Sequence, residues 1–260
     1  MDFTGDGTSW KKKKAVEGKM IIAVLSDIHG NLEALEAVSH DLEHRNIDKV
    51  ICLGDNVGYG PDPEEVVQHI RRKGYDSILG NHEFALMDQR GRRWLNFLAA
   101  ENNEATERLL SPESLAYCHG LPLFITVADG HFVHAYPPDS VFRYLYRQPD
   151  EKIAALFRKE AASVFFVGHT HKLQLVTVEK GAIERSRLSR GRIALNADQK
   201  YIINCGSVGQ PRDGDHQAKY LLWNEDSREL EVRFVDYTRE VTMQKIKDRG
   251  FPEAYAIRLR

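Results

Sequence analysis

Short apolar segments and amphipathic segments alternate along the first third of the chain. The first apolar segment begins at Met20 and reads IIAVLS, a run rich in β-branched residues that is typical of a buried parallel strand. Apolar residues then recur at three- and four-residue spacing over residues 32–42, which predicts a helix. Two more strands are predicted at residues 50–53 and 77–79, with another helix between them. Because successive strand–helix units favour parallel strands with right-handed crossovers, the carboxyl ends of these strands should share one edge of a sheet.

The pattern changes twice further along. Residues 84–118 have a helical pattern and predict a helical insertion beside that edge, a candidate cap. After Pro122 short apolar runs separated by turn residues predict further strands, and an amphipathic stretch from Thr238 predicts a closing helix. The simplest architecture is a single α/β domain over residues 20–260, with two packed sheets flanked by helices.

Composition and charge limit the kinds of partner that the protein is expected to bind. Apolar residues make up 42% of the 260-residue chain and charged residues 28%, the ordinary balance of a globular protein. The formal net charge of -2 gives no general attraction to nucleic acid or to an anionic membrane, so stable binding to either is not expected. Three widely spaced cysteines favour a reducing cytoplasm, and no apolar run is long enough to cross a bilayer. A phosphate-bearing partner would need local charge or a metal.

Residues 1–19 differ from the rest of the chain. They contain scattered Gly, Ser and Thr and a run of four lysines, without an apolar pattern. A nucleic-acid or lipid contact is one interpretation of the lysines. A flexible N-terminal tail is the interpretation that we adopt.

Polar clusters follow several of the predicted strands. Taken singly, each has an ordinary explanation: Asp27 can start a helix, Asp55 can form a turn, and His82 can be a surface histidine. Taken together, carboxylates and imidazoles at neighbouring strand ends would be poorly satisfied without a cation, which favours a metal site. The residues concerned are Asp27, His29, Asp55, Asn81, His82, His134, His169 and His171.

These clusters occur in a recognisable order: Asp27-x-His29, Gly54-Asp55, Gly80-Asn81-His82-Glu83, His134 and Gly168-His169-x-His171. In that order they resemble the five blocks of the calcineurin-like metallophosphoesterases. Residues 58–63, 204–214 and 250–254 further resemble a small bacterial and archaeal branch of predicted phosphodiesterases or diadenosine tetraphosphatase-like proteins. The resemblance covers nearly all of the chain after Met20 and implies a four-layer α/β/β/α sandwich.

The resemblance also implies a ligand set for two divalent metal ions. One ion would be held by Asp27, His29, Asp55 and His171, and the other by Asp55, Asn81, His134 and His169, with Asp55 as the bridge. Nitrogen ligands favour manganese, iron, zinc or nickel over magnesium. Two such ions about 3.5–4 Å apart can share a hydroxide that attacks phosphorus.

His82 has a different implied role. In the family this histidine faces the substrate, where it stabilises the transition state and protonates the leaving group. The protein serine/threonine phosphatase branch has an aspartate three places after the bridging one to orient it, and here that place is Gly58. Glu83, Asp62 and a backbone carbonyl are the alternatives for orienting the ring.

Substrate contacts are the least defined part of the site. Residues 134–139 depart from the His-Gly-Ser/Thr-Pro-Arg-Asp loop usual in the branch, and Tyr136 would stack on a base or cover the metals. Asn81 is a further candidate for contacting the substrate. Arg212 follows a glycine-rich loop and would bind a second phosphate or pair with Asp213 or Asp215. The arginines at 90, 92 and 93 are candidates in the cap or part of a solvated helix face.

The function that we expect is hydrolysis of phosphodiester or phosphoanhydride bonds in a nucleotide or other small phosphate-containing molecule. A phosphoprotein phosphatase is the alternative, which Gly58 and the small size of the chain disfavour. A non-catalytic scaffold on the same fold is a third hypothesis. It is disfavoured because His82 and all seven implied metal ligands are present.

Overall fold

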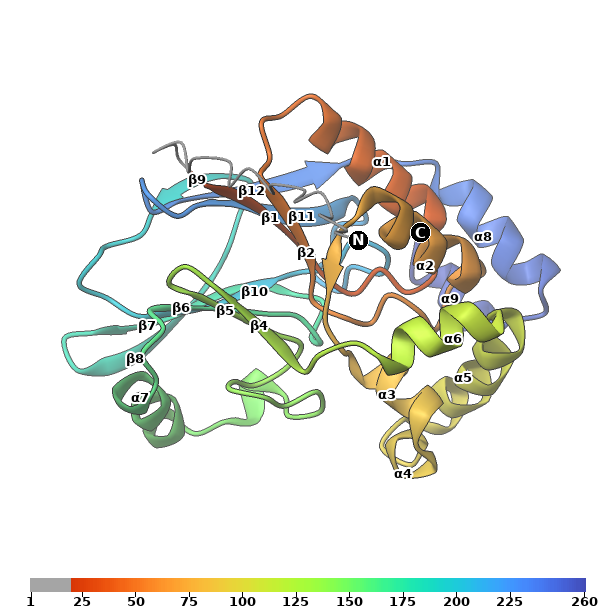
Figure 1. Cartoon of the computed structure of the whole chain (residues 1–260), viewed down its shortest axis with the longest axis horizontal. Coiled ribbons are helices and arrows are strands. Elements are labelled where there is room, and N and C mark those ends of the chain that lie inside the picture. Colours follow the sequence, from red (N-terminus) through yellow and green to blue (C-terminus); the bar gives the residue numbers. More distant parts are fainter. Residues whose placement is uncertain (1–19) are drawn as a thin grey trace, which may run out of the picture.

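The computed structural model describes residues 20–260, and its strands form two packed six-stranded sheets (Figure 1). The tail predicted at residues 1–19 lies outside the described residues. The first sheet has the order β3 (Asp76–Ser77), β2 (Lys49–Cys52), β1 (Ile21–Leu25), β11 (Ala218–Asn224), β12 (Glu229–Val235) and β9 (Gly191–Ala194). The second has the order β4 (Phe124–Val127), β5 (Gly130–Val133), β6 (Val164–Val167), β10 (Tyr201–Cys205), β7 (Leu173–Glu179) and β8 (Ala182–Arg187).

The parallel arrangement predicted for the first three strands is confirmed. β2 pairs in parallel with both β1 and β3, so the three strands end at the same edge of the sheet. On its other side β1 pairs antiparallel with β11, with Ile21 opposite Asn224. In the second sheet β6 pairs in parallel with β5 and with β10. The parallel strands of both sheets deliver their polar ends to one region.

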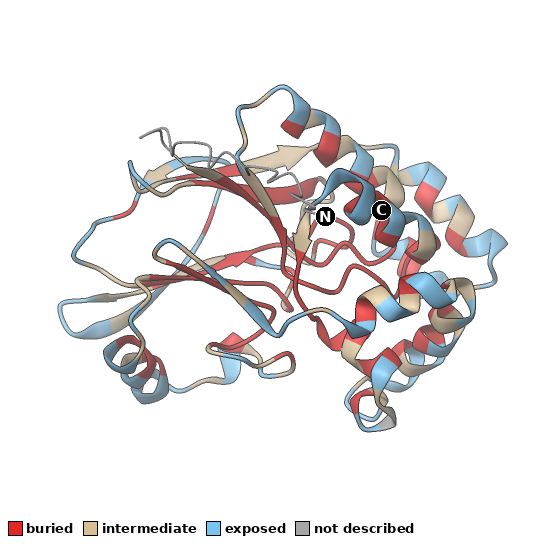
Figure 2. Cartoon of the chain, viewed as in Figure 1, coloured by how far each residue is buried: buried red, intermediate tan, exposed pale blue. Residues whose placement is uncertain are grey.

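The main core lies between the two sheets, where Figure 2 shows mostly buried residues. Because side chains alternate along a strand, every second residue of β1 and β2 points into this layer, including Val24 and Ile51. From the second sheet Phe132 and Phe166 stack with their ring centroids 4.8 Å apart, and the fully buried Trp223 packs against Phe166. This packed layer fixes the relative position of the two sheets.

Helices cover the outer face of each sheet. A buried cluster joins α1 (Leu32–Glu43) and α2 (Pro63–Lys73) to β1, β2 and β11. On the opposite side α7 (Asp150–Lys159) packs on β6 and β10 through Ile153 and Phe157. α8 (Arg239–Asp248) contacts α1, and α9 (Glu253–Ile257) follows it. The four-layer α/β/β/α sandwich implied by the sequence resemblance is confirmed.

The remaining helices follow β3. They are α3 (Asn81–Met87), α4 (Gln89–Arg92), α5 (Phe97–Leu109) and α6 (Pro112–His119), and a short 3-10 helix occurs later at Leu145–Arg147. The four α-helices from α3 to α6 occupy the segment where the sequence predicts helices, over residues 84–118. Among residues 20–260, no helix combines the length and apolar character needed to span a membrane.

Candidate metal centre

The polar residues singled out in the sequence lie together in the loops at the strand ends. Asp27 and Asp55 follow β1 and β2, Asn81 begins α3, and the two histidines at 169 and 171 follow β6. His134 follows β5. All are buried, with exposed fractions between 0% and 8%. The structure therefore brings the seven proposed ligands to a common position between the sheets.

The backbone at this position is unusual. Five of these polar residues have the left-handed conformation that non-glycine residues rarely adopt, namely Asp27, His29, Asp55, His169 and His171, with φ between 51° and 65°. Backbone hydrogen bonds hold the loops in this form: the His29 amide donates to the Asp55 carbonyl at 2.8 Å, and the Gly209 amide donates to the Asp27 carbonyl at 3.1 Å. Residues in such a strained conformation persist only where the surrounding structure holds them, and they are concentrated at functional sites.

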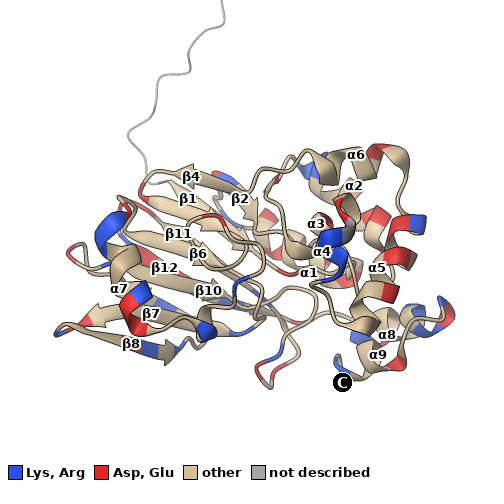
Figure 3. Ribbon diagram, turned by 90° about the horizontal axis from the view of Figure 1, so that it is seen from below, with Lys and Arg blue, Asp and Glu red and all other residues tan. Residues whose placement is uncertain are grey.

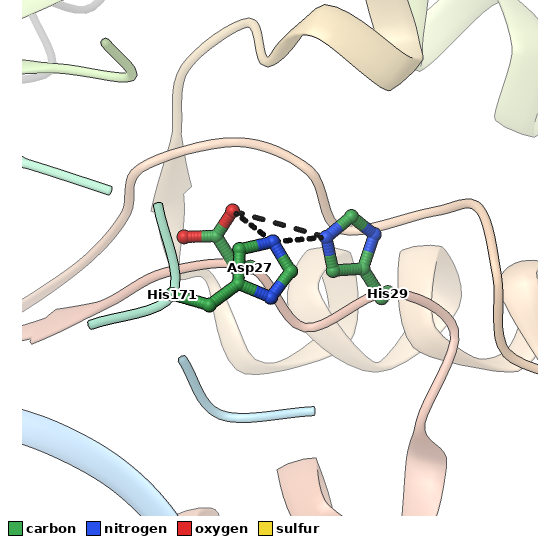
Figure 4. Close-up of side chains that lie close together, drawn as sticks. All are labelled: Asp27, His29 and His171. Carbon is green, nitrogen blue, oxygen red and sulfur yellow. Dashed lines mark hydrogen bonds and ion pairs between the residues drawn. The ribbon is translucent and has the colours of Figure 1, made fainter. Parts of the chain in front are cut away.

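One group of ligand atoms consists of Asp27, His29 and His171 (Figure 4). The Nε2 atoms of the two imidazoles face each other at 3.1 Å. Nε2 of His171 is also 3.2 Å from Oδ1 of Asp27, an oxygen that has no hydrogen-bond donor among the described residues. Three potential ligand atoms thus converge from two sheets.

A second group consists of Asp55, His134 and His169. Nε2 of His134 lies 3.2 Å from Nδ1 of His169, 3.4 Å from Oδ2 of Asp55 and 3.0 Å from the amide oxygen of Asn81. The same Asp55 oxygen is 3.7 Å from Nε2 of His29, in the first group. Asp55 therefore lies between the two groups.

Backbone carbonyls fix the tautomers of three imidazoles. The Nδ1 atoms of His29, His134 and His171 donate to carbonyl oxygens at 3.1, 2.8 and 2.6 Å, respectively. In the neutral form of each imidazole, Nε2 then carries a lone pair that points toward the other ligand atoms. The Nε2 lone pairs of His29 and His171, 3.1 Å apart, would repel each other, and a cation between them would remove this repulsion. The residues present therefore fit divalent metal ions.

The electrostatics of the site keep three of its four ligand histidines neutral. Burial holds the pKa of His29 and of His171 well below the usual value, and burial followed by the positive charge of His134 lowers the pKa of His169 to about 3. Burial raises the pKa of Asp27 to about 7. For His134, burial lowers the pKa, but the negative charges of Asp55 and Asp27 oppose it, and the net pKa is about 9. Metal binding would replace that proton.

Glu83 supports the loop of Asp55 rather than the ring of His82. Its side chain is fully buried and accepts hydrogen bonds from the backbone amides of Asp55 at 2.9 Å, Asn56 at 2.7 Å and Val57 at 3.2 Å. Asp62, the second group suggested by the sequence, pairs instead with Lys245 at 2.8 Å. Glu83 thereby fixes the loop that carries Asp55, a role that the sequence pattern does not reveal.

His82 is held next to Asp55 without a partner for its ring Nδ1. Its backbone amide donates to Oδ1 of Asp55 at 2.8 Å, and its carbonyl accepts from Asn103 at 3.0 Å. Nδ1 has no hydrogen-bond partner among the described residues, and it faces Gly58. None of the groups suggested for orienting the ring does so through Nδ1. The missing side chain at position 58 leaves room for the imidazole.

A cavity of about 770 Å³ opens over these residues. Asp55, Asn81, His82, His169 and His171 are part of its lining, and Trp94, Phe142, Tyr144 and Arg212 form parts of its walls. Trp94 stacks on Phe142 with a centroid distance of 5.4 Å, although 71% of its surface is exposed. The cavity therefore joins a polar floor to an aromatic wall.

The structure places Tyr136 outside this cavity. Its ring packs in the buried cluster beneath α7, and its hydroxyl donates to the carbonyl of Lys152 at 3.0 Å. Tyr144 and Tyr59 are the tyrosines that line the cavity. The ring of Tyr144 stacks on His169 at 4.2 Å, and that of Tyr59 lies 4.5 Å from the ring of His82. Sequence reasoning missed Tyr144, and its only signal is its place in the loop that follows His134.

Arg212 lines the cavity and does not form the ion pair that the sequence left open. Its guanidinium donates to the side-chain oxygen of Gln210 at 2.7 Å and lies over the ring of Tyr59 at 5.6 Å. Asp213 pairs with Lys219 instead, at 2.6 Å.

The arginines that begin the predicted cap do not line the cavity. Arg90 pairs with Asp88 at 2.6 Å, and Arg92 pairs with Glu107 at 2.7 Å. Arg93 is exposed on the surface. These contacts agree with a solvated helix face.

Known proteins of similar sequence match this chain to different extents. An uncharacterized protein from Methanocaldococcus jannaschii is 38% identical over 246 residues, covering 93% of this chain and 98% of that protein. Serine/threonine-protein phosphatase 2 from Escherichia coli is 28% identical over 124 residues, covering 44% of this chain and 56% of that protein.

Solved structures superpose on almost the whole length of this chain. A metallophosphoesterase from Sphaerobacter thermophilus superposes with a TM-score of 0.79 at 32% identity, covering 93% of this chain and 98% of that one. A hypothetical protein from Pyrococcus horikoshii OT3 superposes with a TM-score of 0.75 at 20% identity, covering 92% and 97%. Residues 20–228 match the calcineurin-like phosphoesterase superfamily domain. With the convergent ligand groups at its sheet edge, the chain belongs to the calcineurin-like phosphoesterase superfamily.

Proposed function

We propose that this protein is a dinuclear metal-dependent phosphoesterase that hydrolyses phosphodiester or phosphoanhydride bonds of a nucleotide or another small substrate. The observation that carries the proposal is the position of Asp55 between two groups of ligand atoms, in the lining of a cavity that His82 also lines. Family membership supports a phosphoester hydrolase in general.

The proposed ligands divide between the two sites. Asp27, His29, Asp55 and His171 would hold one divalent ion, and Asp55, Asn81, His134 and His169 would hold the other, with manganese, iron, zinc or nickel as candidates. When bound, the ions would supply a hydroxide nucleophile at neutral pH and a positive field for the phosphate. The carbonyls that fix the imidazole tautomers keep the ligand atoms aimed at the ions.

His82 is the proposed acid that protonates the leaving oxygen. It lines the cavity, and its backbone contact with Asp55 keeps it beside the proposed metals. Burial lowers the pKa of His82, which makes its protonated form a stronger acid but reduces the fraction of the protein that carries this proton at neutral pH.

The dimensions of the cavity support a small substrate. A volume of about 770 Å³ falls in the range typical for small-molecule sites, and Trp94 and Phe142 provide a flat apolar wall for a base or another ring. The phosphoprotein phosphatase remains the second candidate, favoured by the partial similarity to serine/threonine-protein phosphatase 2.

The first experiment compares substrates and measures the metal content of the protein in the same samples. With manganese supplied, hydrolysis of bis-para-nitrophenyl phosphate, diadenosine tetraphosphate, cyclic nucleotides and a phosphopeptide is measured, together with metal bound per chain. We expect turnover of the diester or the anhydride and about two ions per chain. Preferential turnover of the phosphopeptide would favour the second candidate, and the absence of bound metal would refute the proposal.

The second experiment separates metal binding from proton transfer. His82→Ala should keep both ions and the fold but lower turnover by about 10²–10⁴-fold for a poor leaving group such as a nucleoside. An ester of para-nitrophenol should lose less, because its leaving group needs little protonation. His119→Ala, at an exposed position on α6, is the matched control. Unchanged turnover of every substrate in His82→Ala would remove this residue from the mechanism.

A further inference from the structure

A second cavity lies on the other side of Arg212. It has a volume of about 550 Å³, and Arg212 contributes to the lining of both cavities. Four basic residues line this second cavity, which we call the basic cavity: Lys172, Arg185, Arg187 and Arg212. Asp213 is the only acidic residue among its lining. The basic cavity thus continues from the proposed catalytic cavity at a shared arginine.

The β7–β8 hairpin places these basic side chains together. Gln174 of β7 pairs with Arg187 of β8, and Arg185 lies two residues before Arg187 on the same face of the strand. Lys172 comes directly after the proposed ligand His171 and just before β7 begins. Figure 3 shows basic residues within β8. The hairpin and the metal-binding loop are therefore continuous in sequence and in space.

The charges of the basic cavity are poorly balanced by the protein. Arg185 pairs with Asp150 at 2.6 Å, but neither Lys172 nor Arg187 has a carboxylate within 4 Å among the described residues. Arg187 donates only to the backbone carbonyl of Asp213, at 2.6 Å.

The acidic residue in the lining does not offset this charge. The carboxylate of Asp213 is 2.6 Å from the ammonium of the fully buried Lys219, which neutralises it. Lys172, Arg187 and Arg212 therefore leave a net positive charge that suits an anion.

Arg212 is well placed to bridge the two cavities. Its backbone amide donates to the carbonyl of His171 at 3.1 Å, which fixes it beside the proposed metal site. Its guanidinium is only half-buried and is oriented by Gln210, leaving donors for a phosphate oxygen. A phosphate bound at Arg212 would have the proposed metals on one side and Lys172 with Arg187 on the other.

We propose that the basic cavity binds the continuation of the substrate's phosphate chain, so that the preferred substrate is an oligophosphate with a phosphoanhydride bond rather than a simple diester. The proposal rests on the function proposed above, in which the metals hold the scissile phosphate. Arg212 then holds the next phosphate, and Lys172 and Arg187 hold those beyond it.

The test uses inorganic tripolyphosphate and orthophosphate as inhibitors of bis-para-nitrophenyl phosphate hydrolysis, with manganese in excess. The Lys172→Ala/Arg187→Ala variant leaves the proposed catalytic residues intact and should hydrolyse the diester like the wild type. Its inhibition constant for tripolyphosphate should rise about tenfold, because two charged hydrogen bonds are lost, while that for orthophosphate stays unchanged. Lys180→Ala/Arg158→Ala removes two exposed positive charges outside both cavities and is the matched control.

Two results would overturn the inference without touching the proposed function: an unchanged constant for tripolyphosphate, or an equal rise in the control variant. Calorimetric titration of tripolyphosphate into the wild type and both variants gives a readout that does not depend on turnover. If neither the diester nor diadenosine tetraphosphate is hydrolysed, the proposed function fails, and the calorimetry still tests whether the basic cavity binds tripolyphosphate. Chelation of manganese affects all three proteins equally and cancels in the comparison.

Discussion

A methyl group added at Gly58 would test the position of His82 more sharply than removing the imidazole. A Cβ at this residue would lie 2.2 Å from Nδ1 of His82, whereas ordinary contacts begin at 3.4 Å, so the ring must move by about 1.2 Å. Misplacement of a catalytic group by about 1 Å can cost about 10²-fold in rate. We therefore expect Gly58→Ala to lower turnover of a nucleoside ester about 100-fold while both metals stay bound.

Backbone strain is the competing explanation, and the chain offers a control for it. Gly58 has φ +86°, a conformation that costs an alanine about 1–2 kcal/mol. Gly74, at the end of α2, has φ +65° and no atom within 4 Å of an added Cβ. Gly74→Ala should lose similar stability in a denaturant titration and keep full turnover. If Gly58→Ala also keeps full turnover with metals bound, the reasoning about His82 is wrong.

Three further predictions concern the metals and the stability of the fold. Asp55→Asn should reduce metal content at both sites, whereas His171→Ala should reduce it at one, as elemental analysis would show; equal losses would contradict the bridge. Lys219→Met should cost about 3–5 kcal/mol of unfolding free energy, because it leaves a buried carboxylate unpaired, whereas Lys73→Met, in an exposed pair, should change the stability far less. Burial lowers the pKa of His69 from 6.5, so the unfolded chain takes up that proton first and stability falls as pH drops through 6.5. His69→Gln should show a smaller fall in melting temperature between about pH 7.5 and 5.5, and an identical fall would refute the assignment.

The sequence predicted the fold and the location of the site because both depend on local patterns. Strand ends are marked by polar residues after apolar runs, so the positions of Asp27 and Asp55 followed from the strands alone. The contacts between side chains across the site were harder to predict from the sequence. Whether Tyr136 or Tyr144 reaches the cavity depends on the path of an irregular loop, which no regular spacing of apolar residues predicts. The role of Glu83 could not be predicted from the sequence. Its carboxylate accepts hydrogen bonds from backbone amides, and these groups carry no sequence signal because nearly every residue has one.

The pairing of β1 with β11 has a consequence for how the protein is made. β1 ends at Leu25 and β11 begins at Ala218, so one edge of β1 stays open until almost the whole chain has left the ribosome. At about 5–20 residues per second, that interval lasts about 10–40 seconds. During it, an apolar strand with unpaired backbone groups is exposed to other nascent chains. Chaperones that shield strand edges should therefore matter more for the yield of this protein than for the stability of the finished fold.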